Sequence, residues 1–570
     1  PVFAGCFTNL TLSGNSTNEI RLFQSGSIDR SVSFPNLGYV YRCEVSLYSN
    51  GGTSLSIDPG CEFHMADNSY IFLNGAVQAI GTEAQPIIFT RYPSSTGYWQ
   101  GVRVFNSCWD ADFVHCQFLY AGKDDTYNQR RAFSNTGAGN LNLTNCLIRY
   151  SAGHGIMLED IQSSDIMNVS SLTIQDAAWC GFLGNNTTFH DLSVNGLNLI
   201  NIGDYPIAIS ADLLDRFSGV SFSSIGNPYL AITSYNQTRS ATWPKLGLPY
   251  CFANGFTVND WVTLDISAGC ELVFANYVLY QADTHFTVYG ALNTLGTESD
   301  PVVLRGLDPL LPSTWVGLRI NNPDAACNLN WTTIMNGGLD ENHTPSQEFN
   351  LLYIYRGTVN LNNCTLKLTN HNLLKIEDNN TTSLTGCTLS NASNGILHYY
   401  GTLNLLNNTI TNCSANGIYQ AGGTLNFGSE TAQWNKLDNN ATNIYNNTTI
   451  PFTAAFVYWG STDPAVIDPL LYDNEEGKGE IIFEPWLDES CQNLYYYTLD
   501  TPMGVHLITL STSQLRLSWS AVSGASSYKI LAASSPDSAD WSVAQDNISG
   551  LYANLIVAEN QKFFKVVAVR

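Results

Sequence analysis

The sequence predicts an all-β protein, namely a right-handed parallel β-helix in two tandem units followed by a small β-sandwich. Three observations lead to this prediction. A segment of roughly two hundred residues is duplicated, a shorter period of 22 to 23 residues runs within each copy, and apolar and polar residues alternate between Gly- and Asn-rich turns. Alternation with a period of two is typical of strands, and a fixed repeat of this length is typical of solenoids.

The long duplication has a constant offset over its first part. The segment SVSFPNLGYVY around Pro35 recurs as SATWPKLGLPY around Pro244, an offset of 209 residues (244 − 35). Further along, the string WQG at Trp99 is repeated as WVG at Trp315. Matches spread over so long a stretch indicate that the chain contains two copies of one structural unit.

The short period is clearest in the second copy. The strings GTVNL, GTLNL and GTLNF begin at Gly357, Gly401 and Gly423, which stand 44 and 22 residues apart. Two or three alternating strands per period predict one coil of a parallel β-helix, in which an Asn at a turn can bond to its copy in the next coil. A leucine-rich repeat has a similar period, but it needs a strand–helix unit, and no helical periodicity occurs here.

The start of the chain resembles the end of a unit. FTNLTLSGN at 7–15 is similar to FSGVSFSSIGN at 217–227, the last coil before the second unit. This similarity indicates a cut precursor, a first coil left open for stacking, or a cap coil common to every unit. We expect four segments, a terminal coil, unit 1, unit 2 and a β-sandwich, at residues 1–24, 25–233, 234–497 and 498–570.

Several of these strings resemble the secreted right-handed β-helix repeat proteins of bacteria. They are PGCEF and AGCEL, GAVQAIGTEAQPIIFT and GALNTLGTESDPVVLR, WQG and WVG, and VYWGSTDPAVIDPLLYD with the later FEPWL, within residues 26–487. The resemblance implies the fold and a secreted, extracellular location, free or attached to the cell surface. It implies no single activity, because that family includes lyases, hydrolases, epimerases and adhesins.

The last segment changes character. LRLSWSAVSGASSYKILAAS at 515–534 contains alternating strands with Trp519 and Tyr528, and FFKVVAV follows at 563–569. This pattern resembles a fibronectin type III-like module, which implies a β-sandwich that acts as a spacer, cap or attachment module. We also expect it to cover the open end of the solenoid.

Charge excludes some partners. The chain has 24 Lys and Arg against 48 Asp and Glu, a formal net charge of −24. That field repels nucleic acid and anionic membranes, and it disfavours a polyanionic polysaccharide unless cations bridge the two. No stretch approaches the roughly 20 apolar residues of a membrane span, so we predict no membrane insertion.

The cysteines indicate an oxidising compartment. The chain has 14 Cys without CxxC spacing. The duplicated pairs Cys43/Cys61 and Cys251/Cys270 are candidates for disulfides that lock the start of each unit. The alternative is a ladder of stacked free thiols packed as small hydrophobic groups. The same ladder is the favoured interpretation of the cysteines at 364 and 387.

Two acidic pairs are weak candidates for a binding site. Asp124-Asp125 and Asp340-Glu341 lie in loops at equivalent positions of the two units. Carboxylates are Ca²⁺ ligands, so these loops are candidates for a calcium or carbohydrate site, and apart from such a Ca²⁺ ion the sequence indicates no cofactor. The alternative is a pair of solvated loops.

A GHG triplet centred on His154 resembles part of the polygalacturonase signature. That family also needs an NTD motif and an RIK motif, and neither occurs in this chain. The coil repeat accounts for Gly155-Ile156, because Gly395-Ile396 occupies the same place in another coil. We therefore assign no catalytic residue.

These observations favour a non-catalytic extracellular structural, adhesive or surface-assembly protein. We expect its partners to be further copies of itself, by coil-on-coil stacking, or a cell-surface or extracellular polysaccharide. The alternative is a carbohydrate-active enzyme, either a polysaccharide lyase or a glycoside hydrolase, or a carbohydrate-binding β-helix. The sequence leaves open whether the protein is an enzyme and leans against it.

Overall fold

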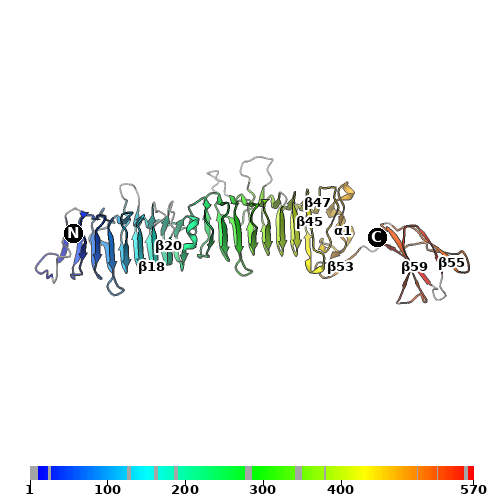
Figure 1. Cartoon of the computed structure of the whole chain (residues 1–570), viewed down its shortest axis with the longest axis horizontal. Helices are drawn as coiled ribbons and strands as arrows, with labels where there is room; N and C mark the ends of the chain where they lie inside the picture. Colours follow the sequence, from blue (N-terminus) through cyan, green and yellow to red (C-terminus); the bar gives the residue numbers. More distant parts are fainter. Residues whose placement is uncertain are drawn as a thin grey trace. The chain divides into compact units, whose positions relative to one another are not determined.

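The chain forms a parallel β-solenoid of about 17 turns, followed by two small antiparallel sheets (Figure 1). This confirms the predicted fold class. The computed structural model describes residues 10–23, 27–124, 130–159, 165–184, 191–275, 285–339, 349–377, 380–496, 499–522, 524–538, 540–556 and 563–569. The chain divides into two compact units, 1–483 with 487–493, and 484–486 with 494–570.

Each coil of the solenoid has three sides, named here face A, face B and face C in chain order. In the first half, face A contains β3 (Val32–Phe34), β6 (Ser54–Ile57), β9 (Ala76–Ile80), β12 (Ala111–Val114), β15 (Asn140–Thr144), the first halves of β18 (Ile166–Ala177) and β20 (Asp191–Ile202), and β22 (Phe217–Ser218). Face B contains β1 (Glu19–Leu22), β4 (Val40–Cys43), β7 (Glu62–Met65), β10 (Ile87–Arg91), β13 (Cys116–Leu119), β16 (Leu147–Ser151), the second halves of β18 and β20, and β23 (Ser221–Ile225). Face C contains β2 (Ser27–Ile28), β5 (Leu47–Ser49), β8 (Tyr70–Leu73), β11 (Gly101–Phe105), β14 (Arg131–Thr136), β17 (His154–Leu158), β19 (Phe182–Gly184), β21 (Ile207–Ile209) and β24 (Leu230–Ile232).

The second half repeats this arrangement. Its face A contains β26 (Ala241–Trp243), β29 (Thr263–Ser267), β32 (Ala291–Leu295), β35 (Cys327–Asn330), β38 (Val359–Asn362), β41 (Thr381–Thr385), β43 (Thr402–Leu406) and β45 (Thr424–Asn426). Face B contains β27 (Tyr250–Phe252), β30 (Glu271–Phe274), β33 (Val302–Gly306), β36 (Thr332–Met335), β39 (Thr365–Lys367), the first parts of β42 (Thr388–His398) and β44 (Thr409–Gln420), β46 (Asn435–Asp438) and β49 (Val457–Tyr458). Face C contains β25 (Asn236–Gln237), β28 (Phe256–Val258), β31 (His285–Val288), β34 (Gly317–Asn321), β37 (Asn350–Arg356), β40 (Asn372–Ile376), the later parts of β42 and β44, β47 (Thr442–Asn446) and β50 (Leu471–Tyr472).

The two halves meet at one shared strand, β24. Its Leu230 is in register with Ile207 of β21 on one edge and with Tyr250 of β27 on the other. β24 is therefore the last strand of face C in the first half and also continues into face B of the second half. At the start of the chain, β1 pairs β4 and β2 pairs β5 in the way that β24 pairs β27 and β25 pairs β28. The solenoid is thus continuous through the joint. Each face of the second half, however, lies one side further around the solenoid than the equivalent face of the first half.

Apolar side chains stack inside the solenoid from coil to coil. Phe63, Phe89 and Phe118 occupy consecutive coils on face B, with ring centroids 5.0 and 5.4 Å apart and nearly parallel planes. All three rings are buried. This spacing follows the separation of about 4.8 Å between neighbouring strands, so each coil buries its apolar residues against copies of itself.

The duplicated tryptophans have the same role in both halves. The indole N–H of Trp99 donates to the Leu119 carbonyl oxygen at 2.8 Å, and that of Trp315 donates to the Met335 carbonyl oxygen at 2.9 Å. Gly101, two residues after the first tryptophan, has a φ of 105°, and a Cβ there would lie 2.4 Å from a backbone oxygen of the next coil. Packing inside the solenoid therefore accounts for the repetition of WQG as WVG in the two halves.

Asparagine side chains form the predicted ladders along the solenoid, but the ladder residues lie within strands and not at the turns where they were expected. On face C of the second half, Asn416 donates to Asn394 at 2.8 Å, and Asn394 donates to Asn372 at 2.9 Å. On face A, the Asn360 amide donates to Asn328 at 2.9 Å. Each amide thereby satisfies its neighbour between coils.

The predicted disulfides are absent from the described residues. Cys43, Cys61, Cys251 and Cys270 are buried free thiols. The residue in register with Cys43 in the next coil is Met65, and the residue in register with Cys251 is Val273, so neither cysteine lies beside its expected partner. The ladder expected at the cysteines 364 and 387 is present, because the first donates its backbone N–H to the sulfur of the second at 3.4 Å.

The solenoid ends in short strands, helical turns and β48. These elements are η3 (Thr431–Gln433), β48 (Phe452–Thr453), α1 (Pro464–Ile467), η4 (Asp468–Leu470), η5 (Asn474–Glu476) and β51 (Ile481–Ile482). A further helical turn, η2 (Ala211–Arg216), lies at the joint. The short strands β52 (Trp486–Leu487) and β53 (Leu494–Tyr495) pair with each other where the chain passes from the first compact unit to the second. Within the described ranges, no helix has the length and apolarity needed to cross a bilayer.

The second compact unit holds two three-stranded antiparallel sheets. One is β54 (His506–Thr509), β55 (Gln514–Ser518) and β58 (Tyr552–Ile556), and the other is β57 (Ser542–Ile548), β56 (Ser527–Ala533) and β59 (Phe563–Val569). Trp519 and Tyr528, singled out in the sequence, lie in the shared core with ring centroids 5.3 Å apart. The predicted β-sandwich is present, and its likeness to fibronectin type III modules stays a prediction.

Candidate functional site

The structure places one of the four predicted acidic site residues. Asp124 lies in the loop after face B, where its carboxylate forms an ion pair with Arg130. Asp125, Asp340 and Glu341 lie outside the described residues. The guanidinium next to Asp124 offers the carboxylate a positive partner, in competition with any cation. Within the described part of the chain, no group of three or more His, Cys, Asp or Glu side chains is arranged to hold a metal ion.

The GHG triplet lies beside this loop. The ring of His154 packs edge-on against Trp179, with 5.1 Å between centroids, and the Arg130 guanidinium lies 5.2 Å from the same indole. The Nδ1 atom of His154 accepts the backbone N–H of Cys180 at 3.2 Å. Three coils therefore meet at this corner of the solenoid through an imidazole, an indole and a guanidinium.

The electrostatics of this corner do not prepare it for acid–base chemistry at neutral pH. Burial lowers the pKa of His154 to about 4, so the imidazole is neutral. Burial and the nearby carboxylate of Asp204 raise the pKa of the Cys180 thiol to about 12, so the thiolate is scarce. A Cβ on Gly155 would lie 2.5 Å from the Ile174 side chain, so this glycine is required for packing. Packing between coils therefore accounts for the GHG triplet without a catalytic role.

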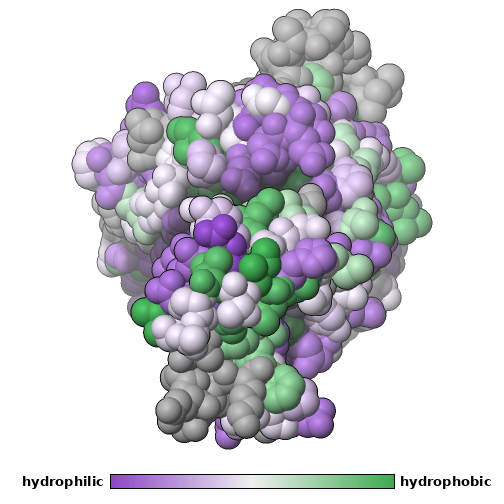
Figure 2. Space-filling view, turned by 90° about the vertical axis from the view of Figure 1, so that its right-hand side faces the viewer, coloured by the Kyte–Doolittle hydropathy of each residue, from purple (hydrophilic) through white to green (hydrophobic). Residues whose placement is uncertain are grey.

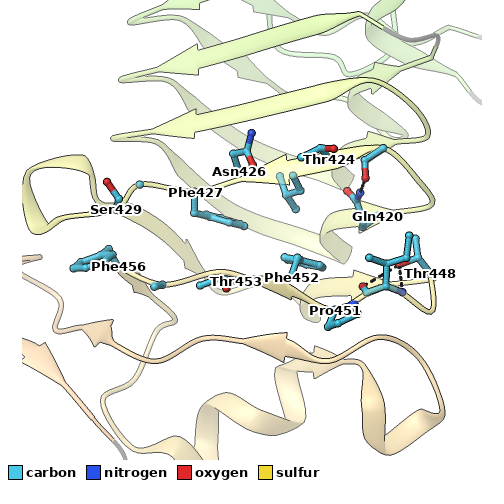
Figure 3. Close-up of a pocket in the computed structure, with 15 residues that line it drawn as sticks. Gln420, Thr424, Asn426, Phe427, Ser429, Thr448, Pro451, Phe452, Thr453 and Phe456 are labelled. Carbon is cyan, nitrogen blue, oxygen red and sulfur yellow. Dashed lines mark hydrogen bonds between the residues drawn. The ribbon is translucent and has the colours of Figure 1, made fainter.

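A second site lies where the sheet of face A is interrupted. Face A of the second half ends at β45, which pairs β43 on one edge. The next strand on this side, β48, pairs β51 instead of β45. Faces B and C continue past this point, since β46 pairs β49 and β47 pairs β50. We name the resulting gap between β45 and β48 the A-face slot (Figure 3).

The A-face slot forms an open pocket of about 570 Å³. Its lining contains no ionisable side chain, although the chain carries a net charge of −24. In Figure 3, Phe427 extends from the row of β45 toward the row of β48, where Phe452 and Phe456 lie. The full lining is Gln420, Gly423, Thr424, Leu425, Asn426, Phe427, Gly428, Ser429, Thr448, Ile450, Pro451, Phe452, Thr453, Ala455 and Phe456. Apolar rings with a few polar groups are typical of small-ligand sites.

Polar groups in the slot are left over from the broken ladder. The amide of Asn426 donates to Asn404 at 2.9 Å, and Asn404 donates to Ser383 at 3.2 Å. Asn426 is the last rung, so no further amide from the next coil reaches its Oδ1 atom among the described residues. Within the same described part, the hydroxyl groups of Thr424 and Thr453 also make no hydrogen bond. These three groups are exposed.

Hydrophobic side chains are also exposed on the C-terminal sandwich. In the end-on view of Figure 2, hydrophobic residues gather near the middle of the visible face, with hydrophilic residues on either side. The most exposed hydrophobic residues of the two antiparallel sheets and their linking loops are Met503, Leu507, Ile508, Val543, Tyr552 and Ile556.

A scan against protein-family models and a search of curated proteins both find no match for this chain. The sequence did not predict the A-face slot, although a signal for it exists. The GTLN string at Gly401 and Gly423 is not repeated one period later, where the chain reads YNNTT around Tyr445. The end of a repeat string marks the last coil in which face A is complete.

Proposed function

We propose that this chain is a non-catalytic, extracellular structural protein: a rod that holds adhesive or assembly surfaces at a fixed spacing. The observation that carries the proposal is the shared strand β24, which joins the two halves with backbone pairing on both edges. A joint of this kind leaves no linker between the halves. About 17 turns at roughly 4.8 Å per coil give a rod of about 80 Å.

The use of polar residues on the outer faces supports the same role. Within each asparagine ladder, on face A and on face C, the amides bond to one another from coil to coil. These side chains are therefore engaged in stabilising the rod. Reactive sites in enzymes place titratable groups with shifted pKa values together in a cleft. The corner with His154 and Cys180 has shifted values, but both shifts favour the neutral form of its residue.

The proposed partners follow from the strand edges and the surface charge. Further copies of the chain are one partner, because a strand edge at the end of a solenoid can template pairing. A cell-surface or extracellular polysaccharide is the other. Where calcium takes part, Asp124, Asp125, Asp340 and Glu341 are the proposed ligands, because loops at equivalent positions of two units can present carboxylates in pairs.

Two measurements on the purified chain test the proposal. Negative-stain electron microscopy is expected to show a straight rod whose halves keep a constant angle from particle to particle. A panel of neutral and acidic polysaccharides, incubated with and without Ca²⁺, is expected to show no depolymerisation. Chain cleavage of any polysaccharide would overturn the non-catalytic role in favour of a lyase or hydrolase. Light scattering that gives only monomers at all concentrations would remove self-association from the proposal.

A further inference from the structure

We propose that the A-face slot binds a neutral saccharide chain, which lies along β45 and β48 and stacks on Phe427 and Phe452. This inference rests on the polysaccharide partner of the proposed function and gives that partner a site and a neutral charge, and it does not depend on the structural role of the rod. It rests on the interruption of face A, the chemistry of the lining and the groups that the interruption leaves without partners.

The width of the slot is limited by the neighbouring faces. Asn435 of β46 remains in register with Val457 of β49, and Ile444 of β47 remains in register with Leu471 of β50. A guest strand between β45 and β48 would need two rungs, roughly 10 Å of separation. Because faces B and C stay paired at one rung, we infer that β45 and β48 do not separate far enough for a guest strand paired on both edges. This geometry disfavours an extended peptide.

The charge of the lining selects a neutral ligand. No Asp, Glu, Lys, Arg or His lines the slot, in a chain with 48 acidic residues. A cationic ligand would find no carboxylate in the slot, and an anionic ligand would find no basic group while meeting the negative field of the whole chain. A neutral ligand therefore loses the least favourable electrostatic free energy when it enters the slot.

The rings and the unpaired polar groups together match a sugar. Phe427, Phe452 and Phe456 are half-buried, so each keeps part of its apolar ring surface in the slot. A pyranose has an apolar C–H face that packs on such rings and hydroxyl groups around its edge. Asn426 Oδ1 and the hydroxyl of Thr453 are available to those hydroxyl groups. A pocket of about 570 Å³ lies within the range of small-molecule sites, so it holds a short stretch of a glycan.

The test measures binding of defined oligosaccharides to the whole chain. The probes are neutral hexasaccharides of β-1,4-linked glucose, mannose and xylose, titrated by calorimetry and by ligand-observed NMR. At least one probe is expected to bind. Phe427→Ala is expected to weaken that binding tenfold or more. The matched control is Trp261→Ala, which removes an aromatic side chain that is 85 % exposed and does not line the slot, and it should leave affinity unchanged.

A second variant covers the case in which Phe427→Ala fails to fold. Thr453→Arg places a long charged side chain at an exposed position of the slot, where the native hydroxyl has no bond to lose, so a normal melting curve is expected together with loss of binding. The proposal is overturned if none of the hexasaccharides binds, or if binding survives both variants. Binding of an extended Asn- and Thr-rich peptide in place of the sugars would equally overturn it.

Discussion

The joint at β24 and the A-face slot show two different outcomes at the end of a run of coils. At the joint, the backbone pairing of face C in the first half continues through β24 into β27 of the second half, so both edges of β24 are paired. At the slot, faces B and C continue while face A stops, so β45 and β48 face each other without pairing. The comparison shows that the three faces of this solenoid are continued or interrupted independently of one another.

Proline substitutions test this difference most strongly. The N–H of Leu230 in β24 donates across the joint to the Pro249 carbonyl oxygen at 2.8 Å. Leu230→Pro removes that bond and a buried side chain, so we expect a loss of about 3 kcal/mol or more. The thermal unfolding of the solenoid, followed by calorimetry, should then split into two transitions, because repeat arrays are held together by nearest-neighbour interfaces.

The corresponding change at the slot is Thr453→Pro. The N–H groups of Phe452 and Ala454 donate to the carbonyl oxygens of Glu480, just before β51, and Ile482 of β51, at 3.0 and 2.8 Å. The N–H of Thr453 between them therefore points into the slot and has no ladder bond to lose. We expect a loss below about 1 kcal/mol, as for proline at a sheet edge. Equal losses in the two variants would contradict the view that the joint is paired and the slot is open.

Acid is expected to have an intermediate effect on both halves, because burial lowers the pKa of His154 in the first half and of His398 in the second. The unfolded chain has an ordinary imidazole, with a pKa near 6.5, whereas burial lowers the pKa of His154 to about 4. The folded state therefore binds fewer protons in this range, and the stability from the neutral imidazole is complete above about pH 6.5 and lost as the pH falls toward 4. Between pH 7 and pH 5 we expect a loss on the order of 1 to 2 kcal/mol. His154→Gln should flatten the pH dependence of the melting temperature over that interval, and an unchanged slope would refute this origin.

The smallest expected difference compares two positions in the asparagine ladders. Asn394 lies in the middle of a ladder and bonds to both Asn372 and Asn416, whereas Asn426 is the last rung beside the slot and bonds to Asn404 alone. We expect Asn394→Ala to cost about 1 to 3 kcal/mol and Asn426→Ala about 1 kcal/mol or less, because the partly buried Asn394 loses two bonds whereas the exposed Asn426 loses one. Chemical denaturation curves of both variants measure the difference.

The repeated elements of the fold were predictable from the sequence, because each coil carries its own copy of the pattern. The positions of Trp99 and Trp315, the asparagine ladders and the stacked cysteines at 364 and 387 all follow from the period. The prediction of the two disulfide pairs is wrong, because the residue in register with a given cysteine depends on turn lengths that the period does not fix. Cys43 is followed in register by Met65, for example.

The joint and the slot were not predicted, because both are departures from the repeat, and the one signal for the slot is the loss of the GTLN string after Gly423. Nothing in the sequence of β24 shows that Leu230 serves two faces at once. The A-face slot depends on the failure of β45 to pair with the following coil, which is a property of two segments and not of either string alone. Of the acidic pairs, Asp124 is paired with Arg130, a basic residue that follows it within the same loop of the sequence.

The one-side step at β24 has a consequence for how the rod meets its surroundings. Since face C of the first half leads into face B of the second, surfaces that are copies of each other look out in different directions around the axis. Any two equivalent patches on the halves are therefore displaced along the axis and also rotated around it by one side of the solenoid. A flat target touches one of them at a time, whereas a ligand that winds around the rod, or several ligands arriving from different sides, can occupy both.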